Sequence, residues 1–505
     1  DGTGADVPEN LRARVRDLAG RIRASREMDA FLHAAGGAFV PPGPAGLLTR
    51  GGDGVLPTGR NLHSLDPARV PTKAAWRVGQ RLADRLIARY RDDHGSWPET
   101  AAFYWMASDL VSADGEGLAQ MFALLGVEPV WDGGGRVKGS RPIPLARLGR
   151  PRVDIAVRIS GIIRDNFSGM ISLLDDAVRT VATLEEDPEM NAVRRHVQAA
   201  LDVGEDLRDA TTRIFGSMPG TYTSGVNLAV LASAWREEKD LAEIYLATNG
   251  YAYGSGLSGK EAHRQFARSL GSVSLTFNKV ASDEHDLLGC CCYYGNHGGM
   301  TAAARHLTGK EVKAYYGDTR DPHRAEVRTL ADELRRVVQA RLLNPAWIDG
   351  MKAHGYRGAS EMTRRITRVY GWEASTREVD DGIFDSIART FVMDPGNREF
   401  FREENPWGLE EIARRLLEAE RRGLWQADPE VKAALEGAYL EIESWMEDRI
   451  AGGEIQGGSV EIYTAGDVAD WSRSLERVLR EVHRERAQGP PGSGGAGAKP
   501  RGEGG

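Results

Sequence analysis

The spacing of apolar residues divides the chain into helical stretches and one stretch of a different kind. An N-terminal helix is marked by an apolar stripe of Leu11, Val15, Leu18, Ile22 and Met28. Gly- and Pro-rich sequence over 36–60 interrupts it, and Thr72 is placed to cap a helix that runs to Tyr90. Helical patterns return from 185 to 449, broken by Gly/Tyr/Ser-rich loops near 216–226, 249–260 and 289–299.

The stretch 99–185 has the pattern of alternating strands and helices. Apolar runs at 101–106 and 153–157 predict buried strands, and helices are predicted over 117–125 and 165–183. Such alternation indicates β-α-β units and a mainly parallel sheet, whose ligands usually bind at the carboxyl ends of the strands. The segment that follows Val157 is therefore a candidate binding loop.

The predicted fold class is α/β followed by mainly α, with a parallel-sheet β-α-β domain and large helical domains. The expected division is a helical region at 1–98, the α/β sheet domain at 99–185, a mainly helical domain at 186–340, a helical C-terminal domain at 341–450, a peripheral helix at 451–487 and a disordered tail at 488–505. The peripheral helix rests on the amphipathic pattern of Val468–Arg486.

Composition narrows the class of protein. The chain has 505 residues, 41% of them hydrophobic, and 65 Lys+Arg against 73 Asp+Glu give a net charge of −8. This acidic balance argues against a nucleic-acid-coating role, and no apolar run approaches the ~18 residues of a membrane helix. Three adjacent cysteines make no disulfide framework, so a reducing, cytoplasmic location is expected. The first residue is Asp1, and no signal-peptide pattern opens the chain, which suggests a fragment or a processed piece.

Two glycine-rich segments imitate nucleotide-binding motifs. Residues 254–260 fit a phosphate loop, but Glu261 stands where Ser or Thr should bind magnesium, and residues 248–253 lack the pattern of a buried strand. We expect a flexible connecting loop there and no ATP hydrolysis by this chain. Residues 115–117 resemble a dinucleotide turn without its third glycine, and a plain strand-to-helix loop is the better interpretation.

Residues 284–299 hold the densest group of potential metal ligands and acid–base residues. They include Glu284, His285, Asp286, Cys290, Cys291, Cys292 and His297. No Cys-x-x-Cys zinc spacing is present, and adjacent cysteines are expected to project in diverging directions. The alternative is that the first three residues cap a helix while the thiols fill space in the core.

Two other segments carry residues suited to anions. Arg60 and Asn61 end a Leu-Pro-Thr-Gly-Arg-Asn loop, and Arg158, Ser160 and Arg164 follow the strand at 153–157. Guanidinium groups bind carboxylates and phosphates with two hydrogen bonds, although single arginines more often form surface ion pairs. Tryptophans and tyrosines such as Tyr104 and Trp105 can stack on a flat ligand, with core packing as the alternative.

Taken in order along the chain, several separated motifs resemble the carboxyl-terminal half of the large subunit shared by aerobic cobaltochelatase and magnesium chelatase. The resemblance covers roughly residues 50–450. Its motifs are Leu56–Asn61, Asp114–Gly117, Val130–Asp132, Arg150–Ile155 with Ser160–Asp165, Met190–His196, Arg213–Gly216, Val327–Leu330, Asn344–Trp347, Met351–Tyr356 and Asn405–Trp407.

The segment Glu284–Leu287, with His297–Met300, is similar to the cobalt branch of that family. One departure is the cysteine run, which stands where cobalt-type members usually carry an acidic Asp-Ser-Asp-Asp stretch. Thiols favour softer metals than carboxylates do. A second departure is the absence of the family's His-Gly-x-Leu-Glu-type motif, which suggests a partial subunit: either a fragment or a split subunit with a separate N-terminal half.

The resemblance implies an ATP-dependent chelatase that inserts a divalent metal into a tetrapyrrole. It favours cobalt and a hydrogenobyrinic acid diamide-like corrinoid precursor, in cobalamin biosynthesis; the alternative is magnesium and protoporphyrin IX. In the family, ATP is hydrolysed by an AAA+ partner that acts with a companion subunit carrying a metal-binding domain. The metal is a substrate, and no nucleic acid or membrane insertion is expected.

The resemblance also implies roles for the residues above. Glu284, His285 and Asp286 are the predicted proton-transfer group, and Arg60, Asn61, Arg158, Ser160 and Arg164 the predicted tetrapyrrole-binding residues. His297 and His285 are the predicted metal ligands, and Cys290, Cys291 and Cys292 are added to them for the chemistry of their thiols, not because of the resemblance. The other hypotheses are a non-catalytic tetrapyrrole- or metal-binding scaffold and a nucleotide-dependent oxidoreductase, which lacks a proper glycine fingerprint.

Overall fold

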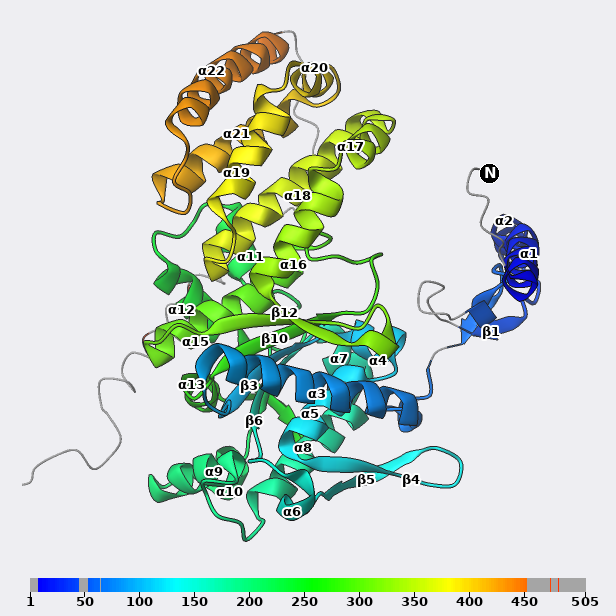
Figure 1. Ribbon diagram of the computed structural model, residues 1–505, viewed down its shortest axis with the longest axis vertical. Coiled ribbons are helices and arrows are strands. Elements are labelled where there is room, and N and C mark those ends of the chain that lie inside the picture. The colour runs from blue at the N-terminus through cyan, green and yellow to red at the C-terminus, as the bar shows by residue number, and fades with distance from the viewer. Residues whose placement is uncertain (1–7, 45–52, 64, 452–472, 474–479, 481–505) are drawn as a thin grey trace, which may run out of the picture.

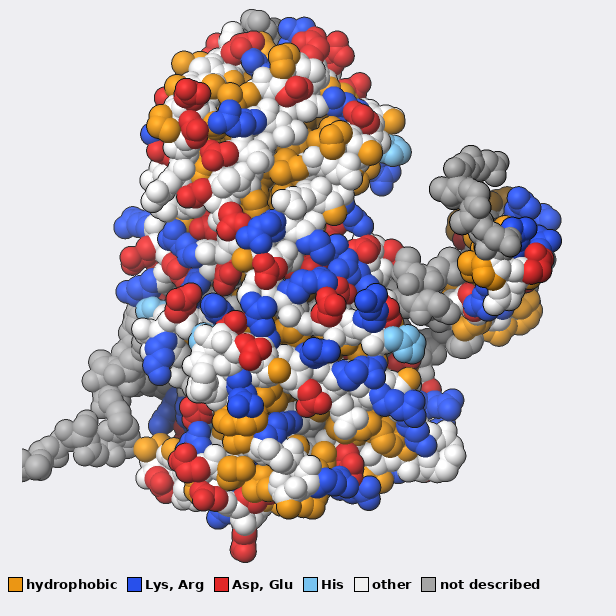
Figure 2. Space-filling view, viewed as in Figure 1, with side chains coloured by type: hydrophobic (Ala, Val, Ile, Leu, Met, Phe, Trp, Pro, Cys, Tyr) orange, Lys and Arg blue, Asp and Glu red, His pale blue; other side chains and the backbone are white. Residues whose placement is uncertain are grey.

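The structure is a computed structural model that describes residues 8–44, 53–63, 65–451, 473 and 480. Figure 1 shows a body built around a sheet, a stack of helices that extends from it, and an N-terminal arm that stands apart. Figure 2 shows basic and acidic side chains interspersed over the visible face, in keeping with the near balance of charges in the sequence.

The body contains one large sheet. Within the described residues its strands are β3 (Thr100–Trp105), β6 (Asp154–Ile159), β7 (Ile214–Gly216), β8 (Tyr251–Gly254), β9 (Leu257–Glu261), β10 (Leu275–Val280), β11 (Lys313–Asp318) and β12 (Glu326–Thr329). Their order is β12-β11-β10-β3-β6-β7-β8-β9. The strands from β11 to β7 run parallel to one another, while antiparallel strands form both edges.

The central strands are buried on both faces. Every residue of β3 and β6 is buried, as the apolar runs in the sequence predict. Along β3, Phe103 and Trp105 point into one hydrophobic core, and Ala102 and Tyr104 point into the other. The sheet is therefore the middle layer between two sets of helices.

Helices cover both faces of this sheet. One core lies under α3 (Lys73–His94), α5 (Glu116–Leu125), α8 (Ser168–Ala182) and α9 (Ala192–Asp202), and the other under α12 (Glu238–Asn249), α13 (His263–Gly271) and α15 (Gly299–Thr308). Shorter helices are α4 (Ala107–Ala113), α6 (Leu145–Leu148), α7 (Gly161–Asn166), α10 (Leu207–Ala210), α11 (Val226–Leu231) and α14 (Cys291–Tyr293). A π-helix, η4 (Tyr294–Gly298), joins α14 to α15.

The C-terminal helices continue the second core. They are α16 (Leu330–Val337), π-helix η6 (Val338–Leu342), α17 (Pro345–Lys352), α18 (Gly355–Thr376), α19 (Asp381–Ile387), π-helix η7 (Ala388–Met393), α20 (Pro395–Glu404), α21 (Pro406–Arg421) and α22 (Pro429–Ala451). One continuous set of buried apolar residues runs from Ala102 in the sheet to Ile442 in α22. The helical stack is thus packed onto the sheet's second face (Figure 1).

Smaller elements complete the chain. The arm contains α1 (Glu9–Arg23), α2 (Glu27–Ala35), β1 (Pro42–Pro44), the short helix η2 (Asp53–Val55) and β2 (Asn61–His63), which pairs with β1. The short helices η3 (Pro67–Arg69) and η5 (Pro322–Arg324) precede α3 and β12, and β4 (Val127–Trp131) pairs with β5 (Val137–Pro142) as a hairpin outside the main sheet.

Several predictions are confirmed. The mixed sheet with many helices agrees with the predicted class. The cap of α3 is present, since Thr72 Oγ1 accepts a hydrogen bond of 3.2 Å from the backbone N–H of Ala75. The predicted helix at 165–183 occurs as two helices, α7 and α8.

Other elements differ from the expectations. The stretch 186–340, expected to be mainly helical, contains helices α9 to α16 and also supplies six of the eight strands described for the main sheet. Residues 251–254 form a buried strand, and 254–261 belong to the β8–β9 hairpin rather than to a flexible loop. Arg158 and Ile159, expected in a loop, are the last residues of β6. These strands are short and contain polar residues, so their own patterns are weak.

The predicted helix at Val468–Arg486 and the tail at 488–505 lie outside the described residues, apart from isolated positions. None of the helices in the described part of the chain combines the length and apolar character needed to span a bilayer.

Candidate active site

A cleft opens at the carboxyl ends of β3 and β10. Along the chain β3 is followed by β6 on one side, and β10 then adds to the other side. The order of connection therefore reverses between β3 and β10, which is where open α/β sheets bind their ligands. The cleft holds about 690 Å³ of empty space, part of it open to solvent, and receives residues from both strands, from α4 and α5, and from the segment that follows β10.

A buried ion cluster forms one wall of this cleft. Lys279 Nζ lies 3.0 Å from Asp109 Oδ1 and 3.3 Å from Glu116 Oε2. Asp109 also accepts hydrogen bonds from Trp105 Nε1 at 3.0 Å and from the N–H of Gly117 at 2.7 Å, at the start of α5. The carboxylate thus fixes a strand end, a helix start and the lysine in one arrangement.

Two amide side chains that line the cleft carry unsatisfied polar atoms. Both side chains are buried, yet three of their atoms have no hydrogen-bond partner among the described residues: Nε2 and Oε1 of Gln120 and Nδ2 of Asn278. Buried polar groups are normally paired, so these atoms can bind water or a ligand in the cleft. Tyr104, Tyr293 and Tyr316 supply aromatic surface to the same space.

The Glu284–Asp286 turn lies at the edge of the cleft. Glu284 and His285 are exposed, and His285 lines the cleft. Asp286 points the other way and is buried, with Oδ2 2.6 Å from Arg341 Nη1 and both carboxylate oxygens 2.9 Å from Arg365 Nη1. The structure therefore places His285 where a ligand can reach it and Asp286 in a double ion pair.

His297 lies in the core on η4. Its Nε2 is 3.1 Å from Thr276 Oγ1, and its Nδ1 has no partner among the described residues. Burial lowers the pKa of His297 to about 3, so the imidazole is neutral. A neutral imidazole is the form that binds metals, but this one is fully buried and does not line the cleft.

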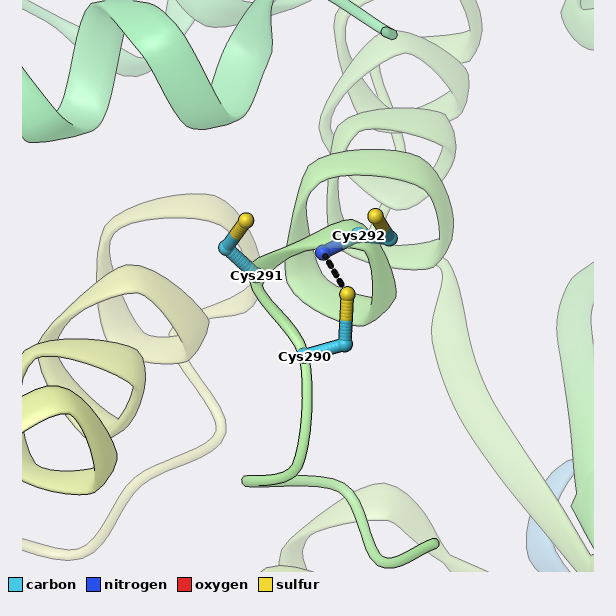
Figure 3. A group of neighbouring side chains, drawn as sticks. All are labelled: Cys290, Cys291 and Cys292. Atoms are coloured by element: carbon cyan, nitrogen blue, oxygen red, sulfur yellow. Dashed lines mark hydrogen bonds between the residues drawn. The ribbon is translucent and has the colours of Figure 1, made fainter. Parts of the chain in front are cut away.

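The three cysteines stand together at the start of α14, and the expectation that they diverge is wrong. All three Sγ atoms lie within 4.8 Å of one another. Cys290 is in extended conformation and Cys291 begins the helix, and Figure 3 shows the Cys290 sulfur directed toward the backbone nitrogen of Cys292. The backbone N–H of Cys292 donates to Cys290 Sγ at 3.3 Å.

A second groove runs along α18 and α21. It holds about 880 Å³ of empty space and is lined by Cys291, Tyr356, Arg364, Arg368 and Trp407, among others. Guanidinium groups beside aromatic rings suit a flat ligand with carboxylate arms. The cysteine segment lies between this groove and the cleft, because Cys291 lines the groove and Tyr293 lines the cleft.

The structure does not bring the predicted tetrapyrrole-binding residues together. Arg60 donates to the carbonyl oxygens of Pro57 at 3.1 Å and Val55 at 3.0 Å within the arm, where Asn61 donates to that of Val40. Figure 1 shows that the arm stands away from the sheet.

The other three residues lie near the end of β6. Arg158 is buried and pairs with Asn249 at 3.0 Å, although its Nη2 has no partner among the described residues. Ser160 caps α7, and Arg164 donates to the carbonyl oxygens of Met218 and Thr221 at 2.9 and 2.8 Å. Ser160 and Arg164 therefore shape the backbone of this region.

Most of the polar groups in the cleft and the groove are not among the residues that the sequence predicts. They are Asp109, Gln120, Asn278, Lys279, Arg364 and Arg368. One available signal was the run of Asn278 and Lys279 at the end of an otherwise apolar strand. The position of the cleft required the strand order, which no local pattern contains.

Comparisons with known proteins bear on the whole chain. The family model for CobN/Magnesium Chelatase matches residues 2–432. An uncharacterised protein of Methanocaldococcus jannaschii is 53% identical over 90% of this chain and 37% of its own length. The aerobic cobaltochelatase subunit CobN of Pseudomonas aeruginosa is 40% identical over 86% of this chain and 36% of its own length.

A solved structure is similar as well. The catalytic subunit of cobaltochelatase from Mycobacterium tuberculosis superposes with a TM-score of 0.80 at 44% identity, covering 83% of this chain and 36% of that one. The chain therefore spans little more than a third of the length of these relatives.

Proposed function

Because the chain belongs to the CobN/magnesium chelatase family, we propose that it is part of the large subunit of a chelatase that inserts a divalent metal ion into a tetrapyrrole. The observation that carries this proposal is the cleft at the reversal of strand order, with His285 at its edge and unsatisfied amide groups inside. The ion is a substrate, and the partner subunits of the family hydrolyse ATP.

Metal insertion makes three physical demands on a protein. A flat macrocycle must be held by its faces and its carboxylate arms, two inner N–H protons must be removed, and the ion must lose its water shell. Aromatic side chains suit the faces, and arginines suit the arms. The cleft supplies aromatic side chains, and the groove along α18 supplies both aromatic side chains and arginines.

His285 is the proposed proton acceptor. Histidine is the residue most often used for proton transfer, and this one is exposed beside the cleft with Glu284 next to it. Asp286 contributes to the same turn by fixing it to Arg341 and Arg365. Its role in this proposal is therefore to position the histidine.

Arg364 and Arg368 are the proposed partners of the macrocycle's carboxylate arms. Arg364 is exposed, and Arg368 uses one nitrogen to donate to the carbonyl oxygen of Leu288 at 2.6 Å, which leaves other N–H groups of its fork. Arg158 remains a candidate through its unpartnered Nη2, whereas the N–H groups of Arg60 and Arg164 are directed to the protein's own carbonyls.

We favour cobalt and a corrinoid precursor because the cobaltochelatase relatives are 40–44% identical to this chain, whereas the magnesium-chelatase relatives are 36–37% identical. Magnesium insertion into protoporphyrin IX is the alternative within the same family. The proposed partners are the AAA+ subunit, its companion with a metal-binding domain, and a polypeptide that supplies the remaining length of the relatives.

The test is a reconstitution of the chain with these partners, ATP, a tetrapyrrole and Co²⁺ or Mg²⁺, with metal incorporation followed by absorbance. Replacing a general base costs about 10²–10⁴-fold, so His285→Ala should lower the initial rate by that factor. His94→Ala is the matched control, because His94 is an exposed histidine at the end of α3, near the amino end of β11.

Two results would contradict the proposal. An unchanged rate for His285→Ala would remove the assigned proton acceptor. An absorbance change on tetrapyrrole binding without any metal incorporation would instead support the scaffold hypothesis.

A further inference from the structure

The cysteine cluster has the dimensions of a metal-binding site. Metal–thiolate bonds of about 2.3 Å place three sulfurs around one ion about 4 Å apart. In this protein the three Sγ atoms lie within 4.8 Å of one another with no ion present. The sulfurs are therefore at most about 1 Å farther apart than one shared ion requires.

The backbone around the cluster is held in place. Cys290 caps α14 through its sulfur, Asn296 Nδ2 donates to the carbonyl oxygen of Cys292 at 2.8 Å, and Asn227 Nδ2 lies 3.7 Å from Cys291 Sγ. Tyr294, two residues after Cys292 and the first residue of η4, is fully buried. The sulfurs of Cys290 and Cys291 are therefore held by contacts within the segment 290–296 and from Asn227 in α11.

A cation lies near the cluster. Arg368 lines the same groove as Cys291, so its guanidinium places positive charge beside the sulfurs that would bind an ion as thiolates. The cluster also lies between the cleft and the groove along α18, both of which are open to solvent.

We propose that Cys290, Cys291 and Cys292 bind a single thiophilic divalent ion through their three sulfurs. The inference rests on the proposed function, for which this site holds the incoming ion before insertion. Sulfur ligands select ions such as Co²⁺, Ni²⁺, Zn²⁺ or Cd²⁺ over Mg²⁺. Three protein ligands leave a coordination position open, as transfer to another ligand requires. Each thiol that binds releases its proton to solvent.

The test is an anaerobic titration of the reduced 505-residue chain with Co²⁺. These three are the only cysteines in the sequence, so any sulfur-to-cobalt charge-transfer absorption comes from them. We expect the band to saturate at one Co²⁺ per chain and to persist in excess Mg²⁺. Substitutions of residues that only support a metal ligand already weaken metal binding about 10–100-fold. Cys291→Ser, which removes a ligand itself, should therefore lower the affinity for Co²⁺ by at least tenfold. The variant with serine at positions 290, 291 and 292 should show no charge-transfer band.

Two variants control for folding and for adventitious binding. Cys290→Ser keeps an acceptor for the N–H of Cys292, so its circular dichroism should match that of the unsubstituted chain while its cobalt affinity falls. His354→Ala removes an exposed histidine and should leave the band unchanged. A chain that gives no charge-transfer band, or binds Co²⁺ equally well without the cysteines, overturns the inference.

The outcome is separable from that of the proposed function. If the triple serine variant inserts cobalt at an unchanged rate in the reconstituted complex, the site is wrong and the chelatase remains. If the charge-transfer band forms but the complex inserts no metal, the site stands and the chelatase is wrong.

Discussion

Asp286 offers the sharpest test of how the structure assigns roles within the Glu284–Asp286 turn. Its side chain is 2% exposed, and its carboxylate contacts Arg341 at 2.6 Å and Arg365 at 2.9 Å. Oδ1 also accepts the N–H of Leu288 at 2.9 Å. Asp286→Ala removes the carboxylate that both guanidinium groups share and leaves Arg365 with Glu361 alone, and breaking a buried pair in this way costs about 3–5 kcal/mol.

Asp286→Asn is a milder version of the same change. The amide oxygen still accepts the N–H of Leu288, while the hydrogen bonds to the arginines lose their charge. Hydrogen bonds to charged groups contribute about 1.5–3 kcal/mol, so the loss should be of that size. The order of stability is therefore wild type, then Asn, then Ala.

Hydrogen exchange of residues 283–297 is the appropriate assay, because it reports local opening without assuming that a chain of this length unfolds in one step. A loss of 3–5 kcal/mol corresponds to about 10²–10⁴-fold faster exchange in Asp286→Ala. Asp283→Asn is the matched control: it lies three residues earlier, is 55% exposed and pairs with Arg320 at 2.7 Å. Such surface pairs contribute about 0–1 kcal/mol.

Two results would refute this reasoning. Equal exchange rates in Asp286→Ala and Asp283→Asn would show that the double ion pair does not hold the turn. Protected amides in Asp286→Asn together with a large loss of chelation would show that the carboxylate acts in the reaction itself.

Two further predictions concern the core and the cleft. Burial lowers the pKa of His297 to about 3 from an unfolded value of 6.5, so the stability that the neutral imidazole contributes is complete above pH 6.5 and is lost as the pH falls toward 3, at about 1.4 kcal/mol per pH unit. In urea titrations between pH 6.5 and pH 4, His297→Phe should therefore lose stability less steeply than the wild type. Parallel curves for the two proteins would contradict this prediction. Lys279→Met leaves Asp109 and Glu116 buried without this cation and should lower the free energy of unfolding by about 3–5 kcal/mol. The control Lys313→Met removes a more exposed ion pair, with Asp93 at 4.0 Å, and should cost less than about 1 kcal/mol. Equal losses in the two variants would contradict the buried role of Lys279.

The elements that the sequence predicts well are those whose signals are local. The apolar run at 101–106 and the run at 153–157 form the two central strands because both of their faces are buried. Thr72 caps α3 because its side chain reaches a backbone N–H three residues later. Each of these features depends on neighbouring residues alone.

Strands β10 and β11 lack such a signal. Polar residues are part of both, and Lys279 is accommodated in β10 because Asp109 and Glu116, more than 160 positions earlier, neutralise it. A charged residue in a short apolar run argues against a buried strand unless its partners are known. The reversal of strand order, and therefore the position of the cleft, cannot be predicted for the same reason: it depends on contacts between residues that are far apart in the sequence.

The candidate arginines illustrate a second limit. Sequence identifies a guanidinium group but not what it binds. Arg158 pairs with Asn249, 91 residues away, and Arg164 with backbone groups more than 50 residues away. Residue type therefore predicts the chemistry that is available, and only the fold decides whether that chemistry serves the protein's own structure or a ligand.

The segment from Glu284 to His297 shows how these two limits meet at the site. Its ends differ in what fixes them, since Asp286 is held by η6 and α18 while His297 is buried against Thr276 of β10. Between these anchors the chain changes from extended to helical at Cys290, which brings three adjacent thiols together although neighbouring residues usually diverge. The sheet supplies the cleft, but the C-terminal helices hold the residues beside it. Substitutions at Arg341 or Arg365, which contact neither the cleft nor the cysteines, should therefore disturb both.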